Sequence, residues 1–540
     1  MIGRLRKEWL AVILLTFLGT GMRLYNLGGQ GIWWDEMFTL LMASGQAGSQ
    51  LGPFYGHGYE GDAMVLNGKA FRDALAKTPS VQPAVVIEDV YRYEPSHPPL
   101  HYVIANLSLA VFGVSDFSLR LPSALFGALT IPFLFLVGRR LYNAETGLIA
   151  AAFFAFAPYE VYYGQEARMY SLLVFLAVAS TWFLVRISYD GQGDLRGSGL
   201  AVWSGYVATS TVGLYTHFLF VFMLGIHFLL VLERHRRDGV FLRRWFLAMG
   251  VCFLVFLPLL FARLFNTNPP PSGLGWFSGQ WPFSRLIRAV LDNILGFAWV
   301  EEIRPYKFLW LLVGLFFVGL LVLRRQRARW LLFWFVVPPA VVLIIDLMLG
   351  THASSVGRYY ILASPALYLI LAQGIAAIRP LMLSRGIAGA VVLYLAIGAY
   401  WTAEGKIHPR IDFKSAGQWI AEKSRPEDLL IMVTPFPNRV RAMHLAYYTT
   451  RPERIIMLRA NDPGGIDLAR WAGDGKPDQQ LTLVVTEMRD WDPKRFDPTS
   501  LNGKASFLKF EEARSYRGLS VFRYRWEESA GPRMNLKNRK

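Results

Sequence analysis

Long apolar stretches recur along most of this chain and are separated by short charged segments. They run from residue 9 to about residue 402. An α-helix needs about 20 apolar residues to cross the hydrocarbon core of a bilayer, and a spanning segment must satisfy its own backbone hydrogen bonds. With 53% hydrophobic residues among 540, the sequence therefore predicts an all-α polytopic membrane protein.

The candidate spans are the apolar stretches that are long enough to cross a bilayer or nearly so. They are 9–27, 119–137, 145–162, 168–187, 200–216, 217–232, 245–264, 308–323, 330–349, 358–377 and 384–402. We expect about eleven membrane-spanning helices, with a range of about nine to thirteen.

Clusters of Lys and Arg set the predicted orientation, because positively charged loops stay in the cytoplasm. Four basic joints lie at 138–143, 234–244, 323–329 and 378–385. With a cytoplasmic N-terminus, the spans alternate so that all four joints are inside and the C-terminus is outside. This topology accounts for the formal net charge of +17, so the expected surroundings are a lipid bilayer and no nucleic-acid partner is predicted.

Residues 98–113 are apolar but short. A helix of this length reaches roughly 24 Å, against a hydrocarbon core of roughly 30 Å. A span here would also spoil the alternation of the basic joints. We therefore expect this segment to be re-entrant or steeply tilted.

The sequence predicts two domains. A transmembrane domain over 1–402 includes a first external loop at 28–97 and a second large external loop at 265–306. From residue 403, helical patterns alternate with short apolar strand patterns, which is typical of an α/β domain. We expect 403–540 to be a small extracytoplasmic α/β domain that ends in a disordered basic tail.

Two parts of the first external loop have helical potential, at 35–44 and 69–77. The apolar residues of the first part alternate loosely with polar ones, as in a helix that lies on a membrane surface. The second external loop is rich in Pro, Gly and Trp, which predicts an ordered but movable loop.

Polar and charged side chains gather at the predicted outer ends of the helices. A charge in the middle of a span costs roughly 2.5–3.5 kcal/mol, so the placement of charges is informative. The candidate site residues are Trp34, Asp35, Glu36, Glu94, His97, Tyr163, Glu166, Arg168, His217, Arg358, Tyr359 and Tyr360. One face of the membrane thus holds acids and cations at the depth of lipid head groups.

Each of these residues also has an ordinary structural interpretation. Arg358 could be an interfacial anchor whose stem snorkels, and His217 could be a packing residue. Glu166 and Arg168 could simply pair with neighbours. Asp35 could cap the helix that follows it, since Asp is favoured there. The position of Asp35 after a span, on the face where basic residues converge, favours a functional role.

Four segments, in this order, resemble the polytopic GT-C glycosyltransferases. They are "GIWWDEMFTLL" at 31–41, "SHPPLHYVI" at 96–104, "RLPSALFGALTIPFLFLVGRRLY" at 120–142 and "APYEVYYGQEARMYSLLVF" at 157–175. The resemblance is to the bacterial branch related to protein O-mannosyltransferases and to the aminoarabinose transferases of lipid A. It covers 1 to about 402 and is strongest over 1–190.

The resemblance implies a transferase of the bacterial plasma membrane that takes a sugar from a polyprenyl-phosphate carrier on the extracytoplasmic side. In such families a carboxylate in the first external loop is the catalytic base, which corresponds to Asp35. Glu36 matches the second acid of the pair, and Glu166 is a further candidate catalytic acid. His97 stands where the aminoarabinose enzymes commonly have a lysine, which puts direct phosphate neutralisation there in doubt because histidine is only partly charged at neutral pH.

The late-helix arginine or tyrosine of these families matches Arg358, Tyr359 and Tyr360. Arg168 and Tyr163 are further candidate ligands of the donor phosphate. Trp34 and His217 are candidate contacts to the acceptor or to the sugar.

The chemistry of such a donor sets the minimal apparatus. The leaving group is already an anionic phosphate and needs no general acid, whereas the acceptor hydroxyl must lose a proton as it attacks. One base and a cationic cradle therefore suffice. Asp35 would be the base, and Arg168 and Arg358 would grip the phosphate with planar forks that stay charged. Direct displacement would invert the anomeric centre.

A divalent ion bridging Asp35, Glu166 and a phosphate is an alternative. The arginines favour chemistry without a metal, so no cofactor is predicted to be required. The expected partners are a polyprenyl-phosphate-sugar donor and an acceptor glycan, lipid or protein. The alternative function is a transporter or flippase of lipid-linked sugars, which would share a basic, aromatic cavity.

Overall fold

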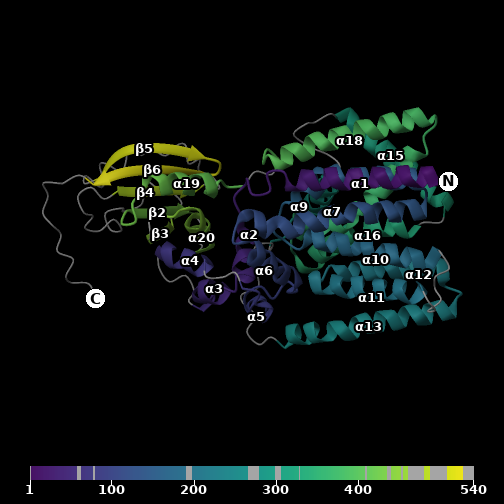
Figure 1. Ribbon diagram of the computed structural model, residues 1–540, viewed down its shortest axis with the longest axis horizontal. Helices are drawn as coiled ribbons and strands as arrows, with labels where there is room; N and C mark the ends of the chain where they lie inside the picture. The colour runs from purple at the N-terminus through teal and green to yellow at the C-terminus, as the bar shows by residue number, and fades with distance from the viewer. Residues whose placement is uncertain are drawn as a thin grey trace. The chain divides into compact units, whose positions relative to one another are not determined.

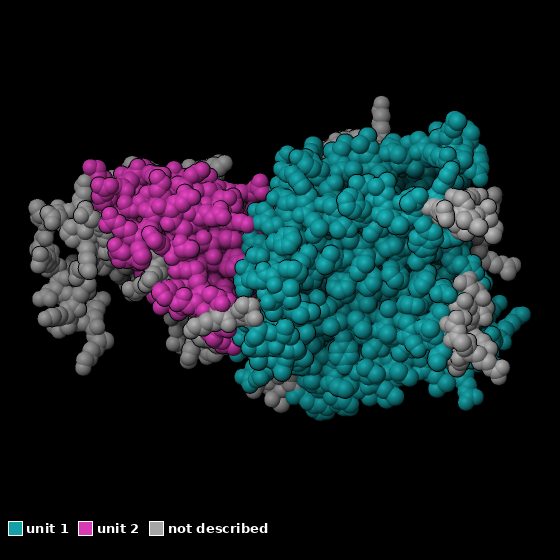
Figure 2. Space-filling model, in the orientation of Figure 1, with its two compact units in different colours: residues 1–29, 42–45, 79–408 teal, residues 30–41, 46–78, 409–540 magenta. Residues whose placement is uncertain are grey.

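The structure is a computed structural model that describes residues 2–56, 63–76, 80–189, 198–265, 279–297, 306–326, 329–407, 410–434, 439–451, 454–459, 480–486 and 508–526. The chain forms two compact units (Figure 2). Unit 1 comprises residues 1–29, 42–45 and 79–408, and unit 2 comprises residues 30–41, 46–78 and 409–540.

The helices that follow the predicted spans run side by side as a bundle in unit 1 (Figure 1). They are α1 (Ile2–Leu24), α7 (Asp116–Leu141), α8 (Ala144–Phe156), α10 (Tyr170–Tyr189), α11 (Ser198–Thr216), α12 (Phe220–His235), α13 (Gly239–Leu264), α15 (Tyr306–Gln326), α16 (Arg329–Leu349), α17 (Ser364–Ala376) and α18 (Leu381–Ala403). Each predicted span overlaps one of these helices.

Shorter elements connect the long helices. They are α5 (Pro83–Tyr93), α6 (Leu100–Phe112), α9 (Pro158–Gly164), α14 (Phe283–Leu295) and the 3₁₀ helices η2 (Ala353–Ser355) and η3 (Gly357–Ala363). Within the described residues, six helical segments are long and apolar enough to cross a membrane, namely α7, α10, α13, α16, η3 with α17, and α18. The chain is therefore a multi-pass membrane protein.

The ends of the helices have local causes in the sequence. Ser115 closes a capping box with Ser118 at the start of α7, and the Asn143 side chain accepts the Thr146 N–H at the start of α8. Pro158 occupies the first turn of α9, where a missing N–H costs nothing. The predicted span 145–162 is therefore two helices, α8 and α9, that break at this proline.

Two other predicted segments can be compared with the structure. The segment 98–113 contains α6, a helix of 13 residues that reaches about 20 Å and cannot cross a core of about 30 Å in a straight line. The predicted loop 265–306 contains the helix α14, which the Pro, Gly and Trp content had hidden. Residues 266–278 and 298–305 of that loop lie outside the described residues.

Unit 2 contains a six-stranded sheet in the order β1-β3-β2-β4-β6-β5. Its strands are β1 (Ala63–Asn67), β2 (Leu429–Thr434), β3 (Arg454–Arg459), β4 (Gln480–Thr486), β5 (Leu508–Tyr516) and β6 (Leu519–Trp526). Strands β3 and β4 pair with β2 in parallel, and the outer strands pair antiparallel. The helices of this unit are α2 (Trp34–Ala43), α3 (Ala47–Gly56), α4 (Gly68–Ala76), α19 (Phe413–Lys423) and α20 (Arg439–Tyr448). The last two residues of α2 belong to unit 1.

The predicted α/β character of the C-terminal part is confirmed, because apolar β2 and β4 supply a buried core around Ile431, Val433 and Leu483. The division of the chain differs from the predicted boundary at 402/403. Strand β1 comes from the segment predicted as the first external loop and pairs with β3 at the edge of the sheet. At five residues it is too short to show a clear strand pattern. The tail beyond Trp526 lies outside the described residues.

A buried arginine, Arg23, holds the end of α1 in unit 1. Arg23 is fully buried, and its guanidinium donates to the carbonyls of Gly19, Ala155 and Phe154, each at 3.0 Å. A Cβ at Gly127 would lie 2.8 Å from the Arg23 Nε, so only glycine leaves room for this side chain. A buried charge is tolerated here because backbone dipoles solvate it.

We predict that Arg23→Leu destabilises the protein by about 3 kcal/mol, because buried carbonyls on α8 lose a charged donor. Thermal unfolding of the protein in detergent, followed by tryptophan fluorescence, measures the effect. Arg92→Leu is the control, since that side chain is 66% exposed and pairs with Glu88 on the same helix. Equal midpoints for the two variants would contradict the role of Arg23.

Candidate functional site

A tight turn before α6 brings an acid and an imidazole together. In Glu94-Pro95-Ser96-His97 the N–H of His97 donates to the Glu94 carbonyl at 3.1 Å, and proline is favoured at the second position of such a turn. The side chains then meet, with His97 Nδ1 2.7 Å from Glu94 Oε1. The Ser96 hydroxyl also donates to Glu94 Oε1, at 2.8 Å.

The electrostatics of this turn favour an ionised acid. Burial alone would raise the pKa of the Glu94 carboxyl, but the hydrogen bond and charge of His97, together with the charge of Arg168, hold that pKa at about 2. Glu94 is therefore a carboxylate throughout the physiological range. It lies within electrostatic reach of Arg168, a predicted phosphate ligand.

Arg168 lies in the segment that joins α9 to α10. The side chain is buried, and its Nη1 donates to the Tyr102 hydroxyl on α6 at 3.2 Å. The Arg168 carbonyl accepts the Ser123 hydroxyl of α7 at 3.0 Å, which fixes the backbone. Glu166, two residues earlier, is also buried. The arginine is therefore held in place by contacts from two neighbouring helices.

His217 lies at the break between α11 and α12. Its Nδ1 accepts the N–H of Leu219 at 3.1 Å, so the neutral ring carries its proton on Nε2. The ring contacts those of His97 and Tyr170, with centroids 5.4 and 5.9 Å apart. His217 also interacts electrostatically with His97, Arg168 and Arg358, and these four residues are termed the basic cluster.

An acid on α16 positions the segment that carries Arg358. Asp346 accepts the Thr351 hydroxyl at 2.6 Å and the N–H groups of Ala353 and Ser354, each at 2.7 Å. These bonds fix η2, which leads directly into η3 and Arg358. The Asp346 carboxylate is therefore a structural anchor and is buried for that reason.

The three predicted tyrosines have different surroundings. Tyr163 is buried against Tyr159 and Tyr170, and the charges of Glu166 and Arg358 act on it. The guanidinium of Arg358 lies over the Tyr359 ring, 5.7 Å from its centroid. Tyr360 is also buried, but its hydroxyl donates to the Ser354 carbonyl at 2.9 Å. Tyr360 therefore supports the turn before Arg358. Its side chain can point to another side than that of Arg358, because neighbouring residues of a short 3₁₀ helix face different directions.

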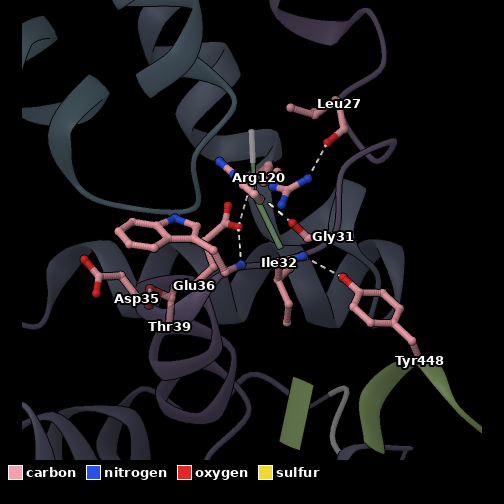
Figure 3. Close-up of polar contacts among 10 residues, drawn as sticks. Leu27, Gly31, Ile32, Asp35, Glu36, Thr39, Arg120 and Tyr448 are labelled. Carbon is pink, nitrogen blue, oxygen red and sulfur yellow. Dashed lines mark hydrogen bonds and ion pairs between the residues drawn. The ribbon is translucent and has the colours of Figure 1, made fainter. Parts of the chain in front are cut away.

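The predicted acid pair lies at the start of α2, in unit 2 (Figure 3). Glu36 is fully buried, and one of its oxygens accepts the Trp33 N–H at 3.1 Å and the Arg410 guanidinium at 2.7 Å. The half-buried side chain of Asp35 points away from these contacts. Trp34 packs on Phe38 one turn later.

This arrangement divides the pair. The bond from the Trp33 N–H to Glu36 is one half of a capping box, in which a glutamate accepts the N–H that precedes the helix. Helix capping, which was considered for Asp35, is therefore a role of Glu36. The N–H of Ile32, just before the helix, also donates to the Tyr448 hydroxyl of α20 at 2.6 Å. Glu36 thus serves the structure of unit 2.

One buried imidazole was missed from the sequence. His101 on α6 hydrogen-bonds the backbone of Ala167, and the charges of Arg168 and His97 act on it. Its Nε2 is buried and has no hydrogen-bond partner within the described residues. Its place in the same segment, "SHPPLHYVI", as His97 was the available signal. Among the described residues, no group of three His, Cys, Asp or Glu side chains could hold a metal ion, and metal-independent chemistry stays a prediction.

Comparisons with known proteins bear on the fold and on the family. Residues 96–261 match the family model of dolichyl-phosphate-mannose-protein mannosyltransferases. YkcB from Bacillus subtilis (strain 168), provisionally described as a mannosyltransferase, is 28% identical over 95 residues. That match spans 18% of this chain and only 13% of the relative.

Solved structures with a similar fold include ArnT from Cupriavidus metallidurans. Its complex with undecaprenyl phosphate has a TM-score of 0.57 at 14% identity, and the match covers 96% of this chain and 99% of that one. The apo form of ArnT has a TM-score of 0.56 at 14% identity, with 95% and 97% covered. This likeness shows a shared fold. The family match makes residues 96–261 similar to the protein mannosyltransferases.

Proposed function

We propose that this protein is a membrane glycosyltransferase that transfers one sugar from a polyprenyl-phosphate carrier to an acceptor hydroxyl. The observation that carries the proposal is the basic cluster, in which His97, Arg168 and Arg358 all act on His217. Three cationic side chains from separate elements suit a phosphate. The fold shared with ArnT, whose structure contains undecaprenyl phosphate, supports a lipid phosphate as the ligand.

The reaction follows from the chemistry of such a donor. The bond between the anomeric carbon and the phosphate oxygen breaks, and the electron pair leaves with an anionic phosphate. Arg168 and Arg358 would stabilise the charge that develops on this leaving group, so no acid is needed. The acceptor hydroxyl forms the new bond at the opposite face of the sugar, which inverts the anomeric centre.

Asp35 is our candidate for the base that takes the proton from the acceptor. Of the two acids in "WWDE", Glu36 is committed to Arg410 and to the start of α2, whereas the Asp35 side chain is half-buried and points elsewhere. A carboxylate with partial access to water is a suitable general base. Glu166 is retained as a second catalytic candidate, since it is buried next to the phosphate ligand Arg168.

Several finer features belong to the same proposal. The reaction would take place on the extracytoplasmic side of a bacterial plasma membrane, with no metal required. The acceptor would be a glycan, a lipid or a protein, and Trp34 and His217 would contact the acceptor or the sugar. A flippase is the other candidate discussed above, but the family match is to a transferase.

The acid pair offers a matched test. Asp35→Asn should lower transfer at least about 100-fold, the usual contribution of a general base, while undecaprenyl phosphate still binds and stability changes little. Glu36→Gln should instead destabilise the protein by about 3 kcal/mol, because a buried arginine loses its partner. Turnover of polyprenyl-phosphate sugars and thermal unfolding in detergent separate the two effects. Full turnover by Asp35→Asn would remove it as the base, and lipid movement without transfer would favour the flippase.

The guanidinium of Arg358 can be tested by its shape. Arg358→Lys keeps the charge but loses the bidentate fork, so we expect transfer to fall about tenfold or more, with the loss mainly in kcat because the phosphate gains charge in the transition state. Arg288→Lys on the exposed face of α14 is the control and should behave like the wild type. Unchanged turnover in Arg358→Lys would exclude Arg358 from the site.

A further inference from the structure

We infer that Glu94 is a positioning residue for donor binding, which holds His97 in its charged form and orients its ring so that Nε2–H can meet a phosphate next to Arg168. The inference rests on the proposed function, since it concerns the same phosphate. It explains why Glu94, an acid that alone would weaken the binding of an anion, lies at this site.

The geometry of the turn is the first support. The Glu94 carboxylate lies 2.7 Å from His97 Nδ1, and the Ser96 hydroxyl bonds both groups, at 2.8 Å to Glu94 Oε1 and 3.1 Å to His97 Nδ1. With Nδ1 facing the carboxylate, the orientation of the ring also fixes the direction of Nε2–H. The two side chains are only 18% and 15% exposed, so water screens the pair weakly. Pro95 within the turn and Pro98 and Pro99 after it restrict the backbone, which favours a pre-formed arrangement.

The surrounding charges are the second support. The charge of Arg168, from the α9–α10 segment, interacts with Glu94. The charges of His97 and Arg168 both interact with His101 on α6. His217 from the α11–α12 break contacts His97, and the charge of Arg358 from η3 interacts with His217. These neighbours are cations or neutral imidazoles, so they disfavour a charge on His97. The Glu94 carboxylate, in contact with that ring, favours the charge.

The proposed phosphate ligands therefore differ in how their charge depends on pH. Arg168 and Arg358 stay charged at every physiological pH. His97 contributes a third positive charge only while it holds its second proton, and an adjacent carboxylate favours that proton. Without Glu94, the ring should lose it at a lower pH, and the affinity for a phosphate should fall with it.

The test is the dissociation constant of undecaprenyl phosphate for the full-length protein in detergent, measured between pH 5 and 9. Glu94→Gln should move the midpoint of the loss of affinity downward by about one pH unit or more, and weaken binding at neutral pH about tenfold. The phosphate's own ionisation near pH 6 is common to all variants, so the difference between variants reports on His97. Glu88→Gln, an exposed glutamate on α5 that pairs with Arg92, is the matched control and should follow the wild type.

A rescue distinguishes charge from folding. His97→Lys carries a charge that does not depend on Glu94, so Glu94→Gln combined with His97→Lys should bind at neutral pH nearly as well as His97→Lys alone. A Glu94→Gln curve that overlays the wild type would overturn the inference, as would equal losses in the His97 and His97→Lys backgrounds. If the wild-type protein does not bind undecaprenyl phosphate at any pH, the proposed function itself fails. Binding that is independent of Glu94 contradicts only the inference.

Discussion

The cost of burying charge governs the membrane unit of this protein. A guanidinium or carboxylate that leaves water needs hydrogen bonds or an opposite charge in return, and three buried groups of this unit show how that need is met. Arg23 is solvated by backbone carbonyls, Arg168 by the Tyr102 hydroxyl, and Asp346 by backbone amides and a hydroxyl. The partners lie at helix ends and breaks, where the backbone has groups to spare. The arginines of the basic cluster follow the same constraint, because Arg168 lies between α9 and α10 and Arg358 lies in the short helix η3.

Local breaks in the helices create the site. Pro158 separates α8 from α9, His217 lies where α11 gives way to α12, and η3 precedes α17. Arg168, His217 and Arg358 lie at or next to such breaks, where their side chains are not fixed by the regular turn of a long helix. The basic cluster is thus a product of irregular backbone inside an otherwise helical unit, which membrane proteins tolerate only where protein or a water-filled cavity surrounds it. In unit 2 the buried Glu36–Arg410 pair fixes the start of α2 and leaves Asp35 as the acid with access to water.

Hydrophobic length and charge patterning predicted most of the helices, because a bilayer imposes both on the sequence. The chemistry of a phosphate leaving group predicted Arg168 and Arg358 as a pair. Three features escaped prediction for physical reasons. Strand β1 depends on a partner strand nearly 400 residues away, and the roles of Glu36 and Tyr360 depend on contacts with Arg410 and Ser354 that no local pattern encodes. The Glu94–His97 pair was encoded locally, in a proline-containing turn, but a turn alone does not reveal a function.

The central claim is that the basic cluster holds the phosphate of a lipid-linked sugar. A cryo-EM structure of the full-length protein with undecaprenyl phosphate tests it most directly. The account predicts phosphate oxygens about 3 Å from guanidinium nitrogens of Arg168 and Arg358, with the lipid tail leaving between helices of unit 1. A phosphate bound elsewhere, with these arginines in contact only with protein, would contradict it.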